Sequence, residues 1–193
     1  MCGRYYVDDE TAREIEKLVR DLDRKLQIER TGDGFPAQNA TIIKGQEHHL
    51  AAEQMRWGFP GFEKGKLLIN ARAESALERR AFRDSIQNRR CIIPSRGFYE
   101  WNKSKEKFTF EREDDTALFM AGCYNRYEDE ERFVILTTEA NSSVALIHNR
   151  MPLILEPEEV EDWVLDDRAT EYLLHKTPGL LKAHAEYEQM RLF

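Results

Sequence analysis

The chain lacks the features that mark membrane-spanning, secreted and disulfide-stabilised proteins. No apolar run approaches the roughly 20 residues needed to cross a bilayer. The first thirty residues are too rich in charge to contain the apolar core of a signal peptide. Only three cysteines occur, Cys2, Cys91 and Cys123, and they lack the spacing of metal ligands. We therefore expect reduced thiols, a cytoplasmic location with no membrane attachment, and neither a metal nor another cofactor.

Internal repeats, low-complexity stretches and linker-like segments are also missing. The 193 residues suit one domain, spanning 1–193, with a sizeable core. A composition of 41% hydrophobic and 34% charged residues is typical of a folded globular protein rather than a disordered one. We expect this domain to be a monomer.

A surplus of positive charge is absent overall but present locally. The net charge of −7 argues against a protein that coats DNA along its length. Residues 56–96 nevertheless contain ten Lys or Arg and four Asp or Glu, a balance of +6 that leaves −13 for the remainder. A basic central segment in an acidic protein favours a confined anionic ligand. A solvated helix face would give the same distribution of charge along the chain.

Apolar periodicity predicts short strands interleaved with a few helices. Ile15, Leu18 and Val19 lie on one stripe of a helix predicted over 8–27, with Asp8 as its N-cap. Other helices are predicted over 77–88, 141–147, 157–164 and 170–174. Strands are predicted over 40–44, 50–57, 67–70, 91–94, 97–101, 108–110, 118–124, 132–138 and 153–155. This order indicates an α+β fold, a single compact domain of mixed, mostly antiparallel β-sheets, barrel-like, with flanking helices.

Cys2 offers the most distinctive chemistry in the sequence. A small second residue lets the initiator Met be removed, so we expect the mature chain to begin at Cys2 with a free α-amine beside the thiol. This 1,2-aminothiol condenses with an aldehyde to an imine, which the sulfur closes to a five-membered thiazolidine. The pair therefore points to an electrophilic carbonyl as substrate. The alternative is an ordinary residue at a frayed terminus.

Two further residues are candidates for proton transfer. Glu100 is an acid within the apolar, aromatic stretch Gly97-Phe98-Tyr99-Glu100-Trp101, where a carboxylate is costly to bury unless it is paired or protonated. His148 lies in a polar break between apolar runs, next to Asn149 and Arg150. His48 and His49 also stand together, but a solvated hairpin turn explains them better than a metal site.

Seven short motifs, in order along the chain, resemble those of one known family. It is the SRAP family, the abasic-site processing proteins also called SOS response-associated peptidases. The matching motifs are Met1-Cys2-Gly3-Arg4, Pro36-Ala37-Gln38, Arg56-Trp57-Gly58, Asn70-Ala71-Arg72-Ala73-Glu74, Arg90-Cys91-Ile92-Ile93-Pro94, Gly97-Phe98-Tyr99-Glu100-Trp101 and Ile147-His148-Asn149-Arg150-Met151-Pro152.

The resemblance implies a protein that senses abasic sites in single-stranded DNA and traps their aldehyde as a thiazolidine DNA–protein cross-link. It implies Cys2 as nucleophile, Asn70 as the residue that holds the sugar or the amine, and Glu100 and His148 as proton-transfer groups. It also implies lyase-type chemistry, autoproteolytic removal of Met1 and association with the nucleoid when the protein is bound to DNA. The DNA-binding residues it implies, for phosphates or for stacking on bases, are Arg4, Pro36, Trp57, Arg72, Arg80, Trp101 and Arg150.

The chain also departs from the family pattern. Asp33 stands near the position of an Asn that usually precedes the Pro-x-Gln turn, the loop after Gly58 is shortened, and Phe62 stands where a Trp is common. Three other functions remain open. N-terminal-nucleophile amidohydrolases also begin Met-Cys-Gly, an autopeptidase could act only on its own Met1, and a non-catalytic DNA-binding module needs no nucleophile.

Overall fold

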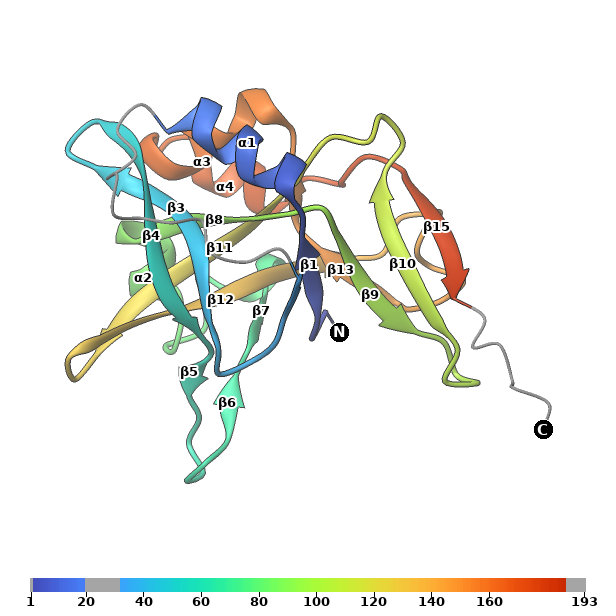
Figure 1. Cartoon of the computed structure of the whole chain (residues 1–193). Helices are drawn as coiled ribbons and strands as arrows, with labels where there is room; N and C mark the ends of the chain where they lie inside the picture. Colours follow the sequence, from blue (N-terminus) through green and yellow to red (C-terminus); the bar gives the residue numbers. More distant parts are fainter. Residues whose placement is uncertain (1, 20–31, 187–193) are drawn as a thin grey trace.

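Five strands of the computed structural model close into a barrel (Figure 1). Neighbouring pairs around it are β4–β3, β3–β8, β8–β11 and β11–β12, all antiparallel, and β12 returns to β4 in parallel. The strands are β3 (Asn39–Gln46), β4 (His49–Trp57), β8 (Arg90–Ser95), β11 (Leu118–Tyr127) and β12 (Glu130–Glu139). The structure describes residues 2–19 and 32–186.

Short strands and a second sheet extend the barrel. β7 (Asn70–Arg72) and β13 (Arg150–Pro152) pair with β12, and β14 (Ile154–Leu155) pairs with β11. The second sheet has the order β15–β10–β9–β1–β2. Its strands are β1 (Tyr5–Val7), β2 (Gly32–Gly34), β9 (Gly97–Trp101), β10 (Lys107–Arg112) and β15 (Leu181–Glu186). β8 continues into β9 after one residue, so the chain passes directly from the barrel into this sheet.

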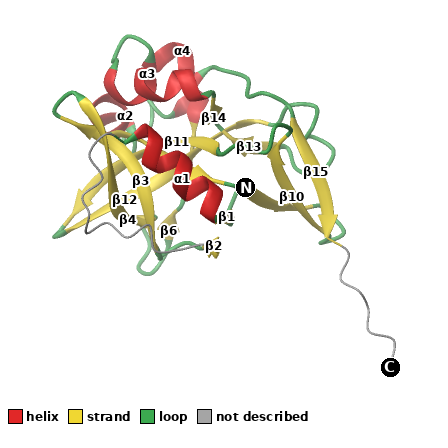
Figure 2. Ribbon diagram, turned by 45° about the horizontal axis from the view of Figure 1, so that its top comes forward, coloured by secondary structure: helices red, strands yellow, loops and turns green. Residues whose placement is uncertain are grey.

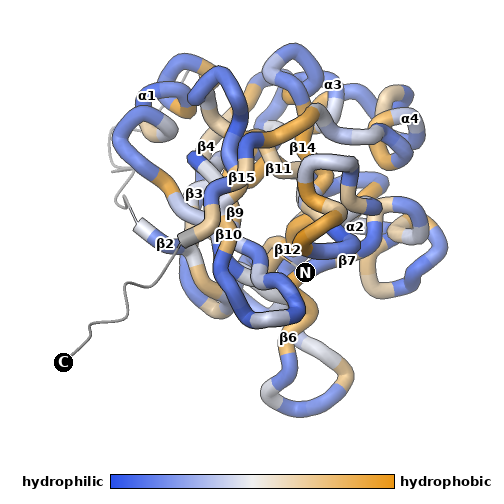
Figure 3. The backbone as a smooth tube through the Cα atoms, turned by 90° about the vertical axis from the view of Figure 1, so that its right-hand side faces the viewer, coloured by the Kyte–Doolittle hydropathy of each residue, from blue (hydrophilic) through white to orange (hydrophobic). Residues whose placement is uncertain are grey.

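Alternating side chains divide the barrel strands between two cores. In β12, Phe133 and Ile135 belong to a cluster that fills the barrel and reaches the second sheet, whereas Val134 and Leu136 belong to the cluster under the helices. Gly122 keeps the barrel narrow, because a Cβ there would come within 2.7 Å of the Val134 carbonyl oxygen and would also clash with Ile93. Figure 3 shows the apolar barrel strands enclosed by more polar connections.

Helices gather on one side of the barrel (Figure 2). They are α1 (Asp9–Leu18), α2 (Arg83–Asn88), α3 (Val160–Leu165) and α4 (Thr170–Leu174), with 3-10 turns η1 (Ala73–Ser75) and η2 (Pro157–Glu159). Asp8 caps α1 by accepting from the Thr11 amide at 2.8 Å, as the sequence predicts. Trp163 of α3 donates its indole N–H to the Cys91 carbonyl at 3.0 Å, which ties this layer to β8.

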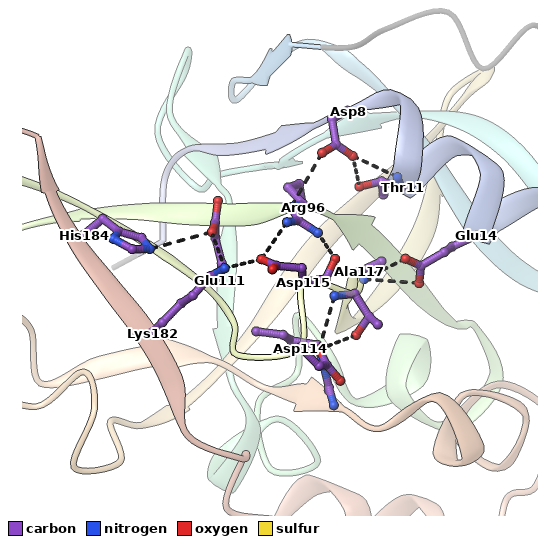
Figure 4. Close-up of polar contacts among 12 residues, drawn as sticks. Asp8, Thr11, Glu14, Arg96, Glu111, Asp114, Asp115, Ala117, Lys182 and His184 are labelled. Carbon is purple, nitrogen blue, oxygen red and sulfur yellow. Dashed lines mark hydrogen bonds and ion pairs between the residues drawn. The ribbon is translucent and has the colours of Figure 1, made fainter.

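A polar network joins the start of α1 to the connections that flank the second sheet (Figure 4). Arg96, between β8 and β9, lies 3.6 Å from the Asp8 carboxylate and 2.9 Å from that of Asp115. Glu14 of α1 accepts from the Ala117 amide at 3.1 Å. These contacts link Asp8 and Glu14 at the N-terminal part of the chain to Arg96, which lies between β8 and β9, and to Asp115 and Ala117, which lie between β10 and β11. The first residues of the chain precede β1 and are placed by it.

The predicted α+β class with mostly antiparallel, barrel-like sheets is confirmed. Every predicted strand overlaps an observed one, but the sequence did not indicate β1, β2, β13, β15 or the two-residue strand β5 (Phe59–Pro60), which pairs with β6 (Leu67–Leu68). Among the described residues, no helix is long and apolar enough to cross a membrane, and no cluster of His, Cys, Asp and Glu suits a metal ion.

Three helix predictions are wrong in extent. The helix predicted over 8–27 ends at Leu18, since Val19 is extended (φ −96°, ψ 109°); residues 20–27 lie outside the described residues. The helix predicted over 77–88 begins only at Arg83, whose guanidinium donates to the Leu77 carbonyl at 2.7 Å and holds the preceding residues in turns. The helix predicted over 141–147 is a set of turns, although Asn141 caps it by accepting from the Ser143 amide at 3.0 Å.

Candidate active site around Cys2

Cys2 is completely buried at the start of the second sheet. The Tyr99 amide donates to the Arg4 carbonyl at 3.0 Å, which continues the pairing of β1 with β9 toward the terminus. That register places Gly3 opposite Glu100. From the barrel side, Asn70 Nδ2 donates to the Cys2 carbonyl at 2.9 Å, so β7 and β9 hold the residue between them.

The surroundings of Cys2 favour the neutral thiol. Burial raises the pKa of the Cys2 thiol well above its usual range, and the nearby charge of Glu100 raises it further. The sulfur lies 3.9 Å from the Arg4 carbonyl. At neutral pH Cys2 is therefore a protonated thiol rather than an ionised thiolate.

Glu100 and Asn70 bring polar groups into the apolar cluster that contains Cys2. Glu100 is 3% exposed and lies on β9 opposite Phe108, close enough to Cys2 for its charge to disfavour the thiolate. The Asn70 Oδ1 is buried, and none of the described residues donates a hydrogen bond to it. A buried amide oxygen with unused acceptor capacity is suited to a donor on an incoming group.

His148 lies in the turn before β13, and the backbone of Arg150 holds its ring. The Arg150 amide donates to His148 Nδ1 at 3.0 Å, and the Arg150 carbonyl oxygen is also 3.0 Å from that nitrogen. An unprotonated Nδ1 accepts from the amide, and a protonated one donates to the carbonyl. Nδ1 therefore has a backbone partner in either tautomer of the neutral ring, and the contact fixes how the ring is oriented.

Arg150 itself does not lie where the resemblance implied. Its side chain is turned inward, and both terminal nitrogens bind Glu74, at 2.6 and 2.9 Å. One of them also donates to the Thr137 carbonyl at 2.6 Å, and the residue is only 8% exposed. This geometry contradicts a phosphate contact by Arg150, because its two terminal nitrogens bind protein groups and its Nε, although without a partner among the described residues, is buried.

Arg4 lies at the rim of the site and is held by Asp33. Its Nε donates to the Asp33 carboxylate at 2.8 Å, a second bond from Nη2 reaches the same oxygen, and Tyr99 donates to the other at 3.1 Å. The guanidinium lies over the Phe35 ring, 4.7 Å from its centroid, and 5.3 Å from that of Tyr99. Nη1 makes no hydrogen bond to any described residue, so one edge of Arg4 is open to a ligand.

Pro36 stands in a tight turn beside Arg4. The Gln38 amide donates to the Phe35 carbonyl at 3.2 Å, and Ala37 has a positive φ of 67°, as the third residue of a type II turn requires. The Ala37 amide donates to the Trp57 carbonyl at 2.9 Å and joins the turn to β4. Pro36 is half-buried, so it presents only part of its ring to a ligand.

Trp57 is a core residue, and its predicted stacking on DNA bases is wrong. It is 1% exposed, its ring stacks on Phe133 with centroids 6.1 Å apart, and its indole N–H donates to the Ile69 carbonyl at 2.9 Å. Trp101, at the end of β9, is 38% exposed and remains available. The exposed aromatic ring near Trp57 in sequence is Phe62, 97% exposed at the tip of the β5–β6 hairpin that projects from the barrel (Figures 1 and 3).

The basic stretch 56–96 separates into two groups. Several members are committed within the protein: Arg90 is buried and pairs with Asp167 at 2.6 Å, and Arg89 pairs with Asp84. Arg72 and Arg80 are exposed, and no described residue forms an ion pair with either. The local surplus of charge is thus partly structural, and Arg72 and Arg80 are among the members that can meet an external anion.

Sequence reasoning gave no role to Asp33 or Glu74, although both lie against site residues. Both carboxylates were visible in the sequence, Glu74 within a motif and Asp33 near one, but their partners Arg4 and Arg150 are 29 and 76 residues away in the chain. The charge of each residue, beside a motif or within one, is the signal that could have suggested a partner.

The family follows from comparison with known sequences. The sequence pattern of the family described as "SOS response associated peptidase (SRAP)" matches residues 1–191, and the chain belongs to this family. Its relatives include the abasic site processing protein YedK of Escherichia coli, 30% identical over 176 residues that cover 85% of this chain and 79% of YedK. The abasic site processing protein YoaM of Bacillus subtilis is 33% identical over 181 residues, with the same shares covered.

Solved structures confirm the architecture. A crystal structure of a protein from Bacteroides thetaiotaomicron is similar over 97% of this chain and 93% of that chain, with a TM-score of 0.81 and 25% identity. A protein from Bordetella bronchiseptica is similar with a TM-score of 0.79 at 23% identity, over 96% of this chain and 100% of that chain, and supports the fold alone.

Proposed function

We propose that the protein processes abasic sites in single-stranded DNA by capturing the ring-opened sugar covalently through Cys2. The observation that carries the proposal is the position of Cys2, buried between Asn70 and Glu100 in a family whose relatives are named abasic site processing proteins. The reaction needs the α-amine of Cys2, so hydrolysis of the Met1–Cys2 peptide bond precedes it and releases Met.

The capture proceeds in two steps. The amine attacks C1′ of the sugar aldehyde, and loss of one water gives an imine. The thiol sulfur then attacks the imine carbon while its proton passes to the nitrogen, which closes the thiazolidine. Holding both reactants in one site replaces a dilute encounter by a local one, which alone lowers such barriers by several kcal/mol.

Neighbouring groups supply the proton transfers and orientation. Asn70 fixes the Cys2 carbonyl and offers its Oδ1 to the amine or a sugar hydroxyl. Glu100 accepts and returns protons during ring opening and imine formation. His148 serves the sugar hydroxyl and reversal of the link, and the backbone of Arg150 orients its ring through Nδ1.

Surface residues position the DNA strand. Arg4 offers its open edge, and Arg72 and Arg80 offer free guanidinium groups to the phosphates flanking the lesion. Trp101 provides an exposed face on which a base can stack. The turn at Pro36 shapes the rim beside Arg4.

Mass spectrometry tests the proposal directly. Protein incubated with an abasic single-stranded oligonucleotide should gain the oligonucleotide mass less one water, and only in molecules that have lost Met1. Cys2→Ala should give an imine that borohydride traps but that otherwise hydrolyses or proceeds to strand cleavage. A heat-stable adduct formed by Cys2→Ala without borohydride, or by protein that retains Met1, would show that the aminothiol is not the reacting group. Glutamine hydrolysis without adduct would indicate an amidohydrolase instead.

A further inference from the structure

Glu74 and Arg150 form a two-pronged ion pair outside the set of residues assigned to the reaction. Arg150 Nη1 donates to Glu74 Oε1 at 2.6 Å, and Nη2 donates to Oε2 at 2.9 Å. Nη2 also reaches the Thr137 carbonyl of β12 at 2.6 Å. A planar guanidinium held by two parallel bonds and a third at its side has one position and one orientation.

One end of this pair reaches His148. Glu74 holds the side chain of Arg150. The backbone amide nitrogen and carbonyl oxygen of Arg150 each lie 3.0 Å from His148 Nδ1. Arg150 also begins β13, where it pairs with Glu139 of β12. The place of the ring therefore depends on where Arg150 is fixed.

The other end reaches Cys2. Glu74 lies in η1, directly after β7, and β7 carries Asn70, which holds the Cys2 carbonyl. Thr137 accepts from Arg150 through its carbonyl, and its hydroxyl donates to the Ala71 carbonyl at 3.4 Å. Few contacts therefore separate His148 from the nucleophile, although the two are far apart in sequence.

We infer that Glu74 is a positioning residue: through Arg150 it sets the place of the His148 ring relative to Cys2 and Asn70. The inference rests on the proposed function of His148 and Cys2. The Glu74 carboxylate accepts two hydrogen bonds from Arg150, and 44% of the Glu74 side chain is exposed. Arg150 consequently acts from inside the protein, as the link between Glu74 and the ring.

The first test needs no DNA. Imidazole NMR signals of the protein are compared with those of Glu74→Gln, which keeps the shape and removes the charge, and of Glu78→Gln, a matched control at an exposed site without side-chain contacts among the described residues. His148→Gln identifies the relevant signal. In Glu74→Gln the His148 signal should move or broaden while those of His175 and His184 stay unchanged. An unmoved His148 signal in folded Glu74→Gln overturns the inference.

The second test measures single-turnover adduct formation and DNA affinity separately. Glu74→Gln should slow the reaction about tenfold, within the range of a misplaced acid–base group, while the dissociation constant changes less than about twofold. Glu74→Asp, which keeps the charge, should recover part of the rate and serves if Glu74→Gln does not fold. Glu78→Gln should match the unmodified protein.

The deciding comparison is the double variant. If Glu74 acts through His148, adding Glu74→Gln to His148→Gln should slow the reaction no further. Independent, multiplied losses, or a loss of DNA affinity equal to the loss of rate, would overturn the positioning role. Absence of any adduct from the unmodified protein would reject the proposed function, and the NMR comparison would still decide whether Glu74 positions the ring.

Discussion

Alkaline pH should destabilise this protein steeply, because it buries three neutral thiols. Cys2, Cys91 and Cys123 are all 0% exposed, and no disulfide joins them. Burial is the largest cause that raises the pKa of each thiol, and for Cys91 the proximity of Cys123 adds to it. An unfolded cysteine titrates near pH 8.5. At a pH between this unfolded pKa and the raised pKa values of the folded state, the three thiols of the unfolded chain lose protons that the folded chain keeps.

The sign and size of the effect follow from linkage. A thiol whose folded pKa is raised contributes stability below its unfolded pKa and loses that contribution as pH rises above it. Each such group lowers the free energy of unfolding by about 1.4 kcal/mol per pH unit, so three lower it by about 4 kcal/mol per unit once the unfolded thiols are ionised. A domain of ordinary stability, about 5–15 kcal/mol, should therefore unfold within a few pH units above 9.

Urea unfolding at pH 7, 8, 9 and 10 measures this slope. The free energy of unfolding should change little up to pH 8 and then fall by about 4 kcal/mol between pH 9 and 10. Cys123→Ala supplies the control: its cavity lowers stability at every pH, but its slope should be about one third shallower because one titrating group is gone. Equal slopes in the two proteins, or a flat profile to pH 10, would show that the buried thiols ionise in the folded state.

Three other predictions concern binding and stability. Trp57→Phe should lower the free energy of unfolding by about 1–3 kcal/mol through its lost hydrogen bond, with no change in DNA affinity of the folded protein, measured by denaturation and by titration. Arg72→Ala and Arg80→Ala should each reduce the slope of log affinity against log salt by about 0.7, and a slope equal to that of the unmodified protein would assign both to solvated surface. Asp33→Asn removes a carboxylate that competes for Arg4, so binding of single-stranded DNA should tighten at low salt; weaker binding would show that the carboxylate is needed for orientation.

Local patterns in the sequence were sufficient to predict most strands. Val134 and Leu136 alternate with Phe133 and Ile135, and this period persists because the two faces of β12 enter different cores. The same period identifies Trp57, two residues after buried Met55, as inward-facing. Its stacking role was taken from the family resemblance instead, and that interpretation ignored the alternation.

Long-range partners were beyond sequence reasoning. Pairing of β1 with β9 brings residues 5 and 98 together, and nothing local to either strand specifies the other. Arg150 likewise shows its charge in the sequence but not Glu74, the residue that satisfies it. Charged residues were therefore predicted to bind phosphate, whereas some of them form ion pairs within the fold. Helix ends failed for a related reason, since Arg83 binds the carbonyls of the turn before it rather than extending a helix through it.

The buried, neutral thiol fits a reaction in which the amine acts first. A thiolate at Cys2 would be the stronger nucleophile, but it would also be open to oxidation and alkylation, and burial beside Glu100 opposes its formation. In the proposed sequence the sulfur attacks only after an imine has formed on the adjacent nitrogen, when the attack is intramolecular. The proximity of the imine carbon then compensates for the nucleophilicity that the sulfur loses by keeping its proton. In the proposed reaction, the same burial that is expected to make the fold sensitive to alkali would reserve the sulfur for a carbonyl already captured by the amine of Cys2.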